Sequence, residues 1–375
     1  MDEKSAGVAQ RSSPEAVRQY YLRPEILRHM YSVCSGKEIV PVYNVTQYGK
    51  RPSSAPFIDD LKYMVQCGAT SFHGSVELWK NPVALSNELN KQEVNTLRTG
   101  WDFILDIDCD VDFEYARATA LMLIDALEMF GIRNYSVKFS GSRGIHIAVS
   151  HNSFPATVNY RPISELYPEL SRQIVGFLRA FIRKRLSKKF IEINPEAVKL
   201  MKDEDSDELN PYNIADVEEN WGVRHLFRLP YSFNEKTWLV SRPLRKEEIS
   251  SFKFEDAVPG NVKGDVSFLD KWEKDEAETL VMETLDWAEG REESQESEKS
   301  LKNIEREFVG WVKNQGVPEE KKIAISAKYR GEGFKEYKGE GFGIPSKKIE
   351  DKYYPPCIIK ILEGVEDGRK REPVS

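Results

Sequence analysis

Hydrophobic residues follow two different spacings along the first half of the chain. Helical spacing, with apolar residues three or four positions apart, occurs at residues 14–30 (broken at Pro24), 59–67 and 113–130. Short runs of β-branched and aromatic residues, typical of strands, occur at residues 38–48, 70–77, 103–107, 135–139 and 145–149. The order strand, helix, strand, turn and strand from residue 103 onward predicts an α/β or α+β sheet domain with an antiparallel hairpin.

The second half of the chain has one long helical pattern and fewer strand-like runs. Residues 165–190 predict a single helix with an apolar stripe and a basic face that includes Arg179 and Arg183. That basic face is either solvated or in contact with a nucleic-acid backbone. Strand-like runs follow at 225–229 and 238–240, and residues 265–290 predict one or two further helices.

Composition shifts divide the chain into four predicted regions. Residues 1–13 are a disordered N-terminus, and residues 14–255 are the principal domain, with a helical insertion at about 160–212. A helical C-terminal region follows at 256–328, with a charged linker at 289–299 and a helix near 304–312. Residues 329–375 are a flexible tail with a candidate partner-binding element at 353–371.

Composition and charge narrow the class of protein. The 375 residues are 40% hydrophobic, enough for a large core, and no apolar run is long enough to predict a membrane span. The N-terminus lacks the apolar segment of a secretory signal and the four cysteines lie far apart, so we expect reduced thiols in the cytoplasm. The net charge of −7 does not by itself indicate nucleic-acid binding, but the acidic residues are clustered and leave basic stretches elsewhere.

The strand at residues 103–107 carries the first candidate chemistry. Asp106 and Asp108 are two positions apart, so they project from the same face of a strand, roughly 6–7 Å apart. Two carboxylates in that position repel each other, and Mg²⁺ or Mn²⁺ relieves the repulsion. The alternative is a strand that runs into a solvated acidic turn, which Asp110 and Asp112 continue.

The turn at residues 140–144 carries the second group of candidate functional residues. Its two glycines allow the backbone to approach a ligand closely, with N–H groups directed outward as in phosphate-binding turns. Ser140 adds a hydroxyl, Arg143 adds a guanidinium suited to phosphate oxygens, and His146 lies on the face opposite Ile145 and Ile147. Taken alone, a turn of this sequence is an ordinary hairpin in most proteins.

The third stretch covers residues 213–244. Asp216 precedes the strand-like run at 225–229, Arg228 lies within that run, and a polar loop follows Pro230. Asp216 is a candidate site residue because it completes a set with the two earlier carboxylates and the glycine turn. His73 could be a ligand or a base, or a core histidine whose nitrogens are satisfied by hydrogen bonds. The sequence favours the core histidine.

In this order the three stretches resemble motifs I, II and III of the archaeo-eukaryotic primase small-subunit family, of archaeal type. The resemblance covers roughly residues 14–250 and implies that family's catalytic fold, with mixed β-sheets flanked by helices and a helical C-terminal extension. By position, the residues that match the family's metal-binding carboxylates are Asp106, Asp108 and Asp216. Those that match its triphosphate-binding residues are Ser140, Arg143 and His146, and Arg228 matches its basic residue in motif III.

The resemblance implies a DNA primase: primer synthesis on single-stranded DNA from nucleoside triphosphates, with two Mg²⁺ or Mn²⁺ ions per site. It also implies a heterodimer with a primase large subunit and a cytoplasmic, nucleoid-associated location. An end-joining or repair polymerase of the same superfamily would share all three motifs. A catalytically silent scaffold that binds nucleic acid or a subunit is the alternative from another class.

The chain departs from the family at two places. Asn234 stands where many members have histidine in the motif III loop, and Trp238 stands where glycine is usual. Contacts from that loop to sugar or phosphate are therefore expected to differ. Many members carry a zinc-binding knuckle after the D-x-D pair, whereas here residue 113 begins a helix directly. We therefore expect no structural zinc.

Overall fold

The computed structural model describes residues 12–86, 88–203 and 206–291, except for the side chains of residues 203–207. The chain divides into two compact units, Met1–Glu289 and Gly290–Ser375. The predictions for residues 1–11, the linker beyond 291, the helix near 304–312 and the tail at 329–375 fall outside the described residues. The four predicted regions therefore stay a prediction.

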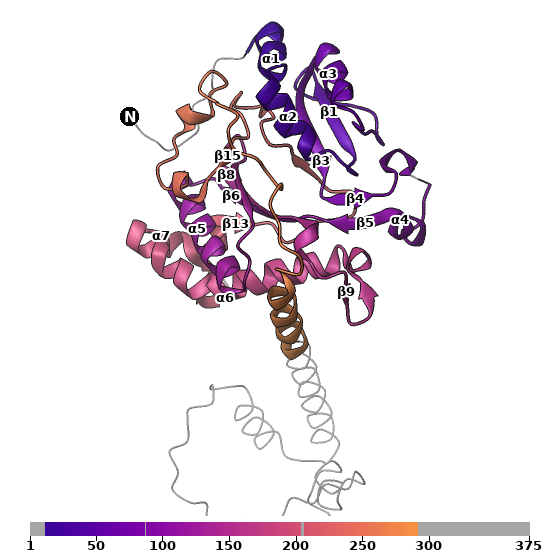
Figure 1. The fold of residues 1–375 in the computed structure, drawn as a ribbon. Helices are drawn as coiled ribbons and strands as arrows, with labels where there is room; N and C mark the ends of the chain where they lie inside the picture. Colours follow the sequence, from indigo (N-terminus) through magenta and orange to yellow (C-terminus); the bar gives the residue numbers. More distant parts are fainter. Residues whose placement is uncertain (1–11, 87, 204–205, 292–375) are drawn as a thin grey trace, which may run out of the picture. The chain divides into compact units, whose positions relative to one another are not determined.

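The first unit contains a four-stranded antiparallel sheet that combines three strands from the N-terminal part of the chain with one from residues 226–228. Its order is β14-β3-β1-β2, built from β14 (Leu226–Arg228), β3 (Ala69–Ser75), β1 (Ile39–Tyr43) and β2 (Gln47–Tyr48). Three helices, α1 (Pro14–Tyr21), α2 (Pro24–Ser32) and α3 (Ile58–Gln66), accompany it (Figure 1). The strand predicted at 38–48 is split, because Asn44 and Val45 adopt φ +49° and +73° in a turn between β1 and β2.

A five-stranded antiparallel sheet forms the centre of the unit. Its order is β13-β6-β8-β7-β15, built from β13 (Ala215–Val217), β6 (Phe103–Cys109), β8 (Gly144–Val149), β7 (Ser136–Phe139) and β15 (Pro243–Leu244). β6 and β7 both run antiparallel to β8, which lies between them. α5 (Phe113–Met129) packs against β6 and β8, and α6 (Glu169–Ile193) packs against α5, as Figure 1 shows. The helices therefore cover the apolar face of this sheet and leave its other face for polar side chains.

Smaller elements surround the two sheets. The pairs are β4 (Glu77–Trp79) with β5 (Arg98–Trp101), β9 (Thr157–Val158) with β10 (Arg161–Pro162), and β11 (Lys202–Asp203) with β12 (Ser206–Leu209). The remaining helices are α4 (Lys91–Leu97), α7 (Ala197–Met201) and short 3₁₀ turns at Pro82–Ala84, His151–Ser153, Ile163–Leu166, Pro211–Asn213, Lys246–Glu248 and Phe254–Ala257. In the described part of the chain, no helix is long and apolar enough to cross a membrane.

The predicted class is confirmed in its α+β form, with three local differences. The strands named above pair only antiparallel, whereas the family resemblance implies mixed sheets. The predicted strand at 238–240 is wrong: Val240 makes one isolated bridge, to Phe233, within a loop. Residues 265–277 carry no helix, and helix spans only 278–291, because Phe268 is buried as part of an irregular segment rather than on a helical face.

Candidate active site

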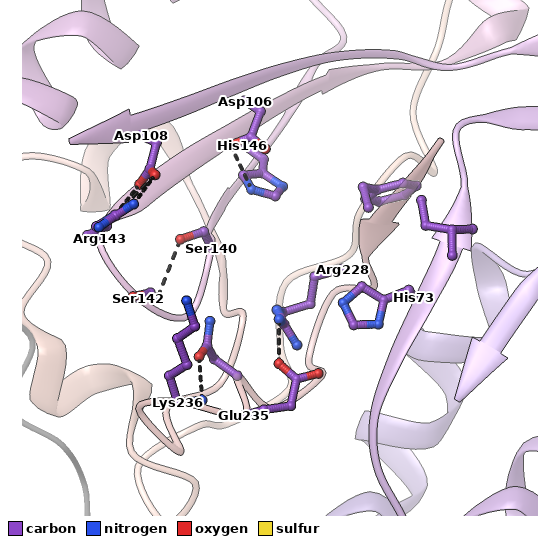
Figure 2. Close-up of a pocket in the computed structure, with 13 residues that line it drawn as sticks. His73, Asp106, Asp108, Ser140, Ser142, Arg143, His146, Arg228, Glu235 and Lys236 are labelled. Atoms are coloured by element: carbon purple, nitrogen blue, oxygen red, sulfur yellow. Dashed lines mark hydrogen bonds and ion pairs between the residues drawn. The ribbon is translucent and has the colours of Figure 1, made fainter. Parts of the chain in front are cut away.

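A cavity of about 350 Å³ opens where strands of both sheets meet. From the five-stranded sheet come Asp106, Asp108 and His146, and from the four-stranded sheet come His73 and Arg228 (Figure 2). The turn after β7 and the loop after β14 complete the lining. Every site residue predicted from the sequence lines this cavity except Asp216.

Asp106 lies in the middle of β6 and faces His146 on the neighbouring strand. The two residues are direct partners in the β6–β8 register, and His146 Nε2 lies 3.1 Å from Asp106 Oδ1. Burial raises the pKa of the Asp106 carboxyl, but His146 and Lys138 outweigh that effect, so its pKa lies below the usual value. Asp106 is therefore a carboxylate at neutral pH.

Asp108 is held by Arg143, which comes from the turn before β8. Arg143 Nε lies 2.9 Å from Asp108 Oδ1 and Nη2 lies 2.8 Å from Oδ2, a two-pronged ion pair. Arg143 also pairs with Asp110, which the sequence assigns to a solvated turn. The guanidinium thus offsets the repulsion between two carboxylates, and hydrogen bonding to Asp108 raises the pKa of Arg143.

Asp216 reaches the same sheet face from β13. It is the direct partner of Asp108 in the β13–β6 register, so the two side chains project from one face. Its carboxylate faces Arg179 of α6, with Nη1 3.3 Å from Oδ1, and Arg179 Nε also lies 2.6 Å from Glu219 Oε1. Burial raises the pKa of Asp216 and is only partly offset by Arg179. The basic face of α6 is therefore engaged in ion pairs at this end.

The three carboxylates fit a divalent cation in donor type and in strand register. In the structure they are not gathered around one point: among the described residues, no group of three or more His, Cys, Asp or Glu is arranged to hold a metal ion. The carboxylates of Asp106, Asp108 and Asp216 are thus aligned along the sheet without surrounding a common position, and their role as metal ligands stays a prediction. The physical reason for this arrangement is that each carboxylate is drawn to a separate partner, His146, Arg143 or Arg179.

The turn between β7 and β8 depends on its glycines and on Ser140. Ser140 Oγ accepts a hydrogen bond from Gly144 N at 3.1 Å, which closes the turn and leaves the hydroxyl hydrogen for another acceptor. A Cβ on Gly144 would lie 2.2 Å from the Ile107 carbonyl oxygen. Gly141 has φ +98°, and a Cβ there would lie 2.8 Å from Asn234 Cβ. No other residue type fits either position without movement.

The loop after β14 is clamped onto that turn. Asn234 Oδ1 accepts from Lys236 N at 2.9 Å, and Thr237 Oγ1 donates to the Gly141 carbonyl oxygen. Trp238 adopts φ +60°, a conformation that glycine takes without strain, so the loop keeps this backbone although the chain lacks the glycine. Lys236 extends from the loop into the cavity toward the turn (Figure 2), and it is a site residue that the sequence analysis did not select.

Arg228 and His73 form the wall from the four-stranded sheet. They are direct partners in the β14–β3 register, and Arg228 Nη2 lies 2.7 Å from Glu235 Oε2. His73 is buried, and its Nδ1 has no hydrogen-bond partner among the described residues, so the expectation of a histidine satisfied by hydrogen bonds is wrong at this nitrogen. Burial lowers the pKa of His73 to about 3, so the imidazole is neutral at neutral pH.

One family of known proteins matches the central part of the chain. Residues 105–245 match the model of the DNA primase small subunit family, a range that contains every site residue predicted above. The DNA primase small subunit PriS of Pyrobaculum aerophilum is 26% identical over 275 residues, covering 58% of this chain and 82% of that protein. The corresponding protein of Pyrobaculum islandicum is 28% identical over 182 residues, covering 40% of this chain and 55% of that protein.

Two further proteins are also similar to this chain. An uncharacterized protein of Methanocaldococcus jannaschii is 26% identical over 153 residues, which cover 41% of this chain but 30% of that protein. The chain thus spans less than two thirds of two of these three relatives. Among solved structures, the polymerase domain of Mycobacterium tuberculosis ligase D in complex with DNA has a TM-score of 0.41 at 16% identity, covering 69% of this chain and 92% of that domain.

Proposed function

We propose that this chain, whose residues 105–245 match the model of the DNA primase small subunit family, is the catalytic subunit of a primase that makes short strands on single-stranded DNA. In the proposed reaction a 3′-hydroxyl attacks the α-phosphorus of a nucleoside triphosphate, a phosphodiester forms and pyrophosphate leaves. The observation that carries the proposal is the meeting of three distant stretches at one cavity, with Asp106 opposite His146 and Asp108 opposite Asp216 in the strand register.

The carboxylates of Asp106, Asp108 and Asp216 would hold Mg²⁺ or Mn²⁺, because hard cations prefer such oxygens. When bound, two such metal ions would lower the pKa of the attacking hydroxyl and stabilise the leaving pyrophosphate. The strand register aligns the three residues on one sheet face, and to share a cation their side chains would exchange their present partners for it.

The turn and the adjoining loop would bind the triphosphate. Ser140 has a hydroxyl hydrogen left to donate, and Lys236 extends into the cavity beside it. Arg143 would exchange its carboxylate partners, Asp108 and Asp110, for phosphate oxygens once a cation takes over the carboxylates. Arg228 lies further along the wall and would face the phosphates while Glu235 holds it in place.

The test is strand synthesis on an unprimed single-stranded template, with labelled ribo- or deoxyribonucleotides, Mg²⁺ or Mn²⁺, and with or without a primase large subunit, which we propose as the partner. The wild-type chain should make product, and Asp106→Ala with Asp108→Ala should make none while melting normally. Asp125→Asn, at an exposed carboxylate on α5, is the matched control and should remain active. Synthesis by the double variant would refute the proposal, and activity confined to gapped or end-bridged duplexes would indicate an end-joining polymerase.

A further inference from the structure

Lys138 is a fully buried lysine directly behind the cavity, and neither the sequence analysis nor the proposed reaction uses it. It lies in β7, with 0% of its surface exposed. Its Nζ lies 2.9 Å from His146 Nδ1 and 2.9 Å from Ser241 Oγ. The rings of Phe227 and Phe268 lie 5.8 and 5.9 Å from the same nitrogen. Lys138, His146 and Asp106 thus form a row across three neighbouring strands.

The surroundings of Lys138 differ from those of the other buried lysine in the described residues. Lys37 Nζ faces a carboxylate, Asp102, and two carbonyl oxygens. Lys138 has no carboxylate within ion-pair distance among the described residues, and its two hydrogen-bond partners are an imidazole and a hydroxyl. A methionine of similar length would fill this space without the cost of burying an amine. The position of the lysine is therefore best explained by what its nitrogen donates.

The partners on both sides of His146 fix where its ring proton lies. Asp106 is a carboxylate and can only accept, so Nε2 must carry a hydrogen to make the 3.1 Å contact. Ser241 Oγ already donates to the Phe139 carbonyl oxygen at 2.9 Å, so it accepts from Lys138. With hydrogen on Nε2, Nδ1 can present a lone pair to Lys138 Nζ, which carries enough hydrogens to donate both to Nδ1 and to Ser241 Oγ.

We propose that Lys138 is a positioning residue that holds the His146 ring with its hydrogen on Nε2, so that this N–H is directed at Asp106 and the cavity. This role rests on the proposed function, because the donor matters only if a nucleotide occupies the cavity. Ser241 holds the lysine head on the side away from His146. The imidazole is thereby fixed both in rotation and in tautomer before any nucleotide binds.

The first test needs no measurement of enzymatic activity. In the full chain labelled with ¹⁵N-histidine, a two-bond ¹H–¹⁵N spectrum at neutral pH reports the tautomer of each of the five histidines. His146, assigned with His146→Gln, should show hydrogen on Nε2 and a lone pair on Nδ1. Hydrogen on Nδ1 of His146 would overturn the proposal. Because this spectrum is recorded without substrate, its outcome is independent of whether the chain is a primase.

The second test separates positioning from support of the fold. Lys138→Met should shift His146 toward a tautomer mixture and raise the nucleotide KM about tenfold with a smaller change in kcat. Ser241→Ala, which loosens the lysine head, should give the same change to a lesser degree. Lys37→Met is the matched control: it removes a buried lysine that does not touch His146, and it should lower the melting temperature without altering the tautomer or KM.

An equal rise in KM for Lys37→Met and Lys138→Met would overturn the proposal, because the effect would then follow from lost stability. An unchanged His146 tautomer in both Lys138→Met and Ser241→Ala would overturn it as well. If the wild-type chain makes no product, the proposed function fails, whereas the tautomer spectra still decide what Lys138 does.

Discussion

Asp216 of β13 lies directly opposite Asp108 of β6, in an antiparallel pair that also sets Val217 against Ile107. This pairing brings the most distant predicted carboxylate onto the sheet face shared by Asp106 and Asp108. It also places Asp216 against Arg179 of α6, outside the cavity lining. The same residue therefore belongs to the site by register and to a surface ion pair by side-chain direction.

Asp216→Asn is expected to reduce strand synthesis at least about a hundredfold while changing stability by less than about 1 kcal/mol, because the Asp216 side chain is 57% exposed and its ion pair with Arg179 is therefore screened by water. Steady-state synthesis and thermal melting measure the two effects. Glu219→Gln, which removes the other carboxylate on Arg179, is the control and should retain activity. Equal losses in both variants would show that the Arg179 cluster, and not the Asp216 carboxylate, supports activity.

Arg143→Ala should strengthen the binding of metal ions and weaken the binding of nucleotide. Removing the guanidinium relieves competition for Asp108 and leaves the repulsion between Asp108 and Asp110 uncompensated, so Mn²⁺ should bind several-fold tighter. The nucleotide KM should rise, because a phosphate partner is lost. Calorimetric titration with Mn²⁺ alone and kinetics with nucleotide measure the two changes. Weaker Mn²⁺ binding in Arg143→Ala would contradict the competition between arginine and metal.

Gly144→Ala is expected to destabilise the chain by about 1–3 kcal/mol, since overpacking against backbone forces the two strands apart. The new Cβ would meet the Ile107 carbonyl oxygen at 2.2 Å, next to Asp106 and Asp108. Gly222→Ala, where nothing lies within 4 Å of the added Cβ, is the control and should be close to neutral. Urea unfolding of both variants gives the comparison, and a neutral Gly144→Ala would mean that the turn can shift freely.

Protonation of His73 should make the fold sensitive to acid. Burial holds the folded-state pKa of His73 at about 3, below the ordinary value of 6.5. Between pH 6.5 and pH 3, His73 is therefore protonated in the unfolded chain but not in the folded chain. Stability from this group is present above pH 6.5 and is lost as pH falls toward 3, at up to about 1.4 kcal/mol per pH unit. In His73→Gln the free energy of unfolding should fall less steeply between pH 6 and pH 4. An identical slope in both proteins would show that His73 already titrates normally when folded.

The regular elements around the site follow from local pattern, because each is covered on one side by a helix or another strand. The alternation in residues 103–107 correctly predicts a strand with Asp106 and Asp108 on one face, and helix α5 begins where the pattern begins. The helix predicted from residue 165 begins instead after Pro168, which has no N–H to donate. The residues 238–240 read as a strand, but the hydrogen bonds of Asn234 and Thr237 hold them in a loop.

The parts of the site that the sequence analysis did not predict depend on contacts between distant segments. A lysine at an alternating strand position, such as Lys138, is normally solvent-facing, and only the cover supplied by Phe227, Phe268 and Ser241 buries it. The partner of Arg143 could not be read from the sequence either, because a guanidinium binds phosphate and carboxylate equally well. In the structure it pairs with Asp108, from another strand. Strand pattern therefore selects candidate ligands, whereas tertiary packing decides what each one touches.

Because β8 lies in the centre of the sheet, the geometry of the site depends on the correct pairing of β6 with β8. β8 carries His146 and begins at Gly144, and its register with β6 sets these residues against Asp106 and Asp108. Because side chains alternate along a strand, a slip of one residue would turn all of them toward the helices at once. The site is thus assembled in full or not at all, and partial misfolding of this pair would leave an inert molecule rather than an impaired one.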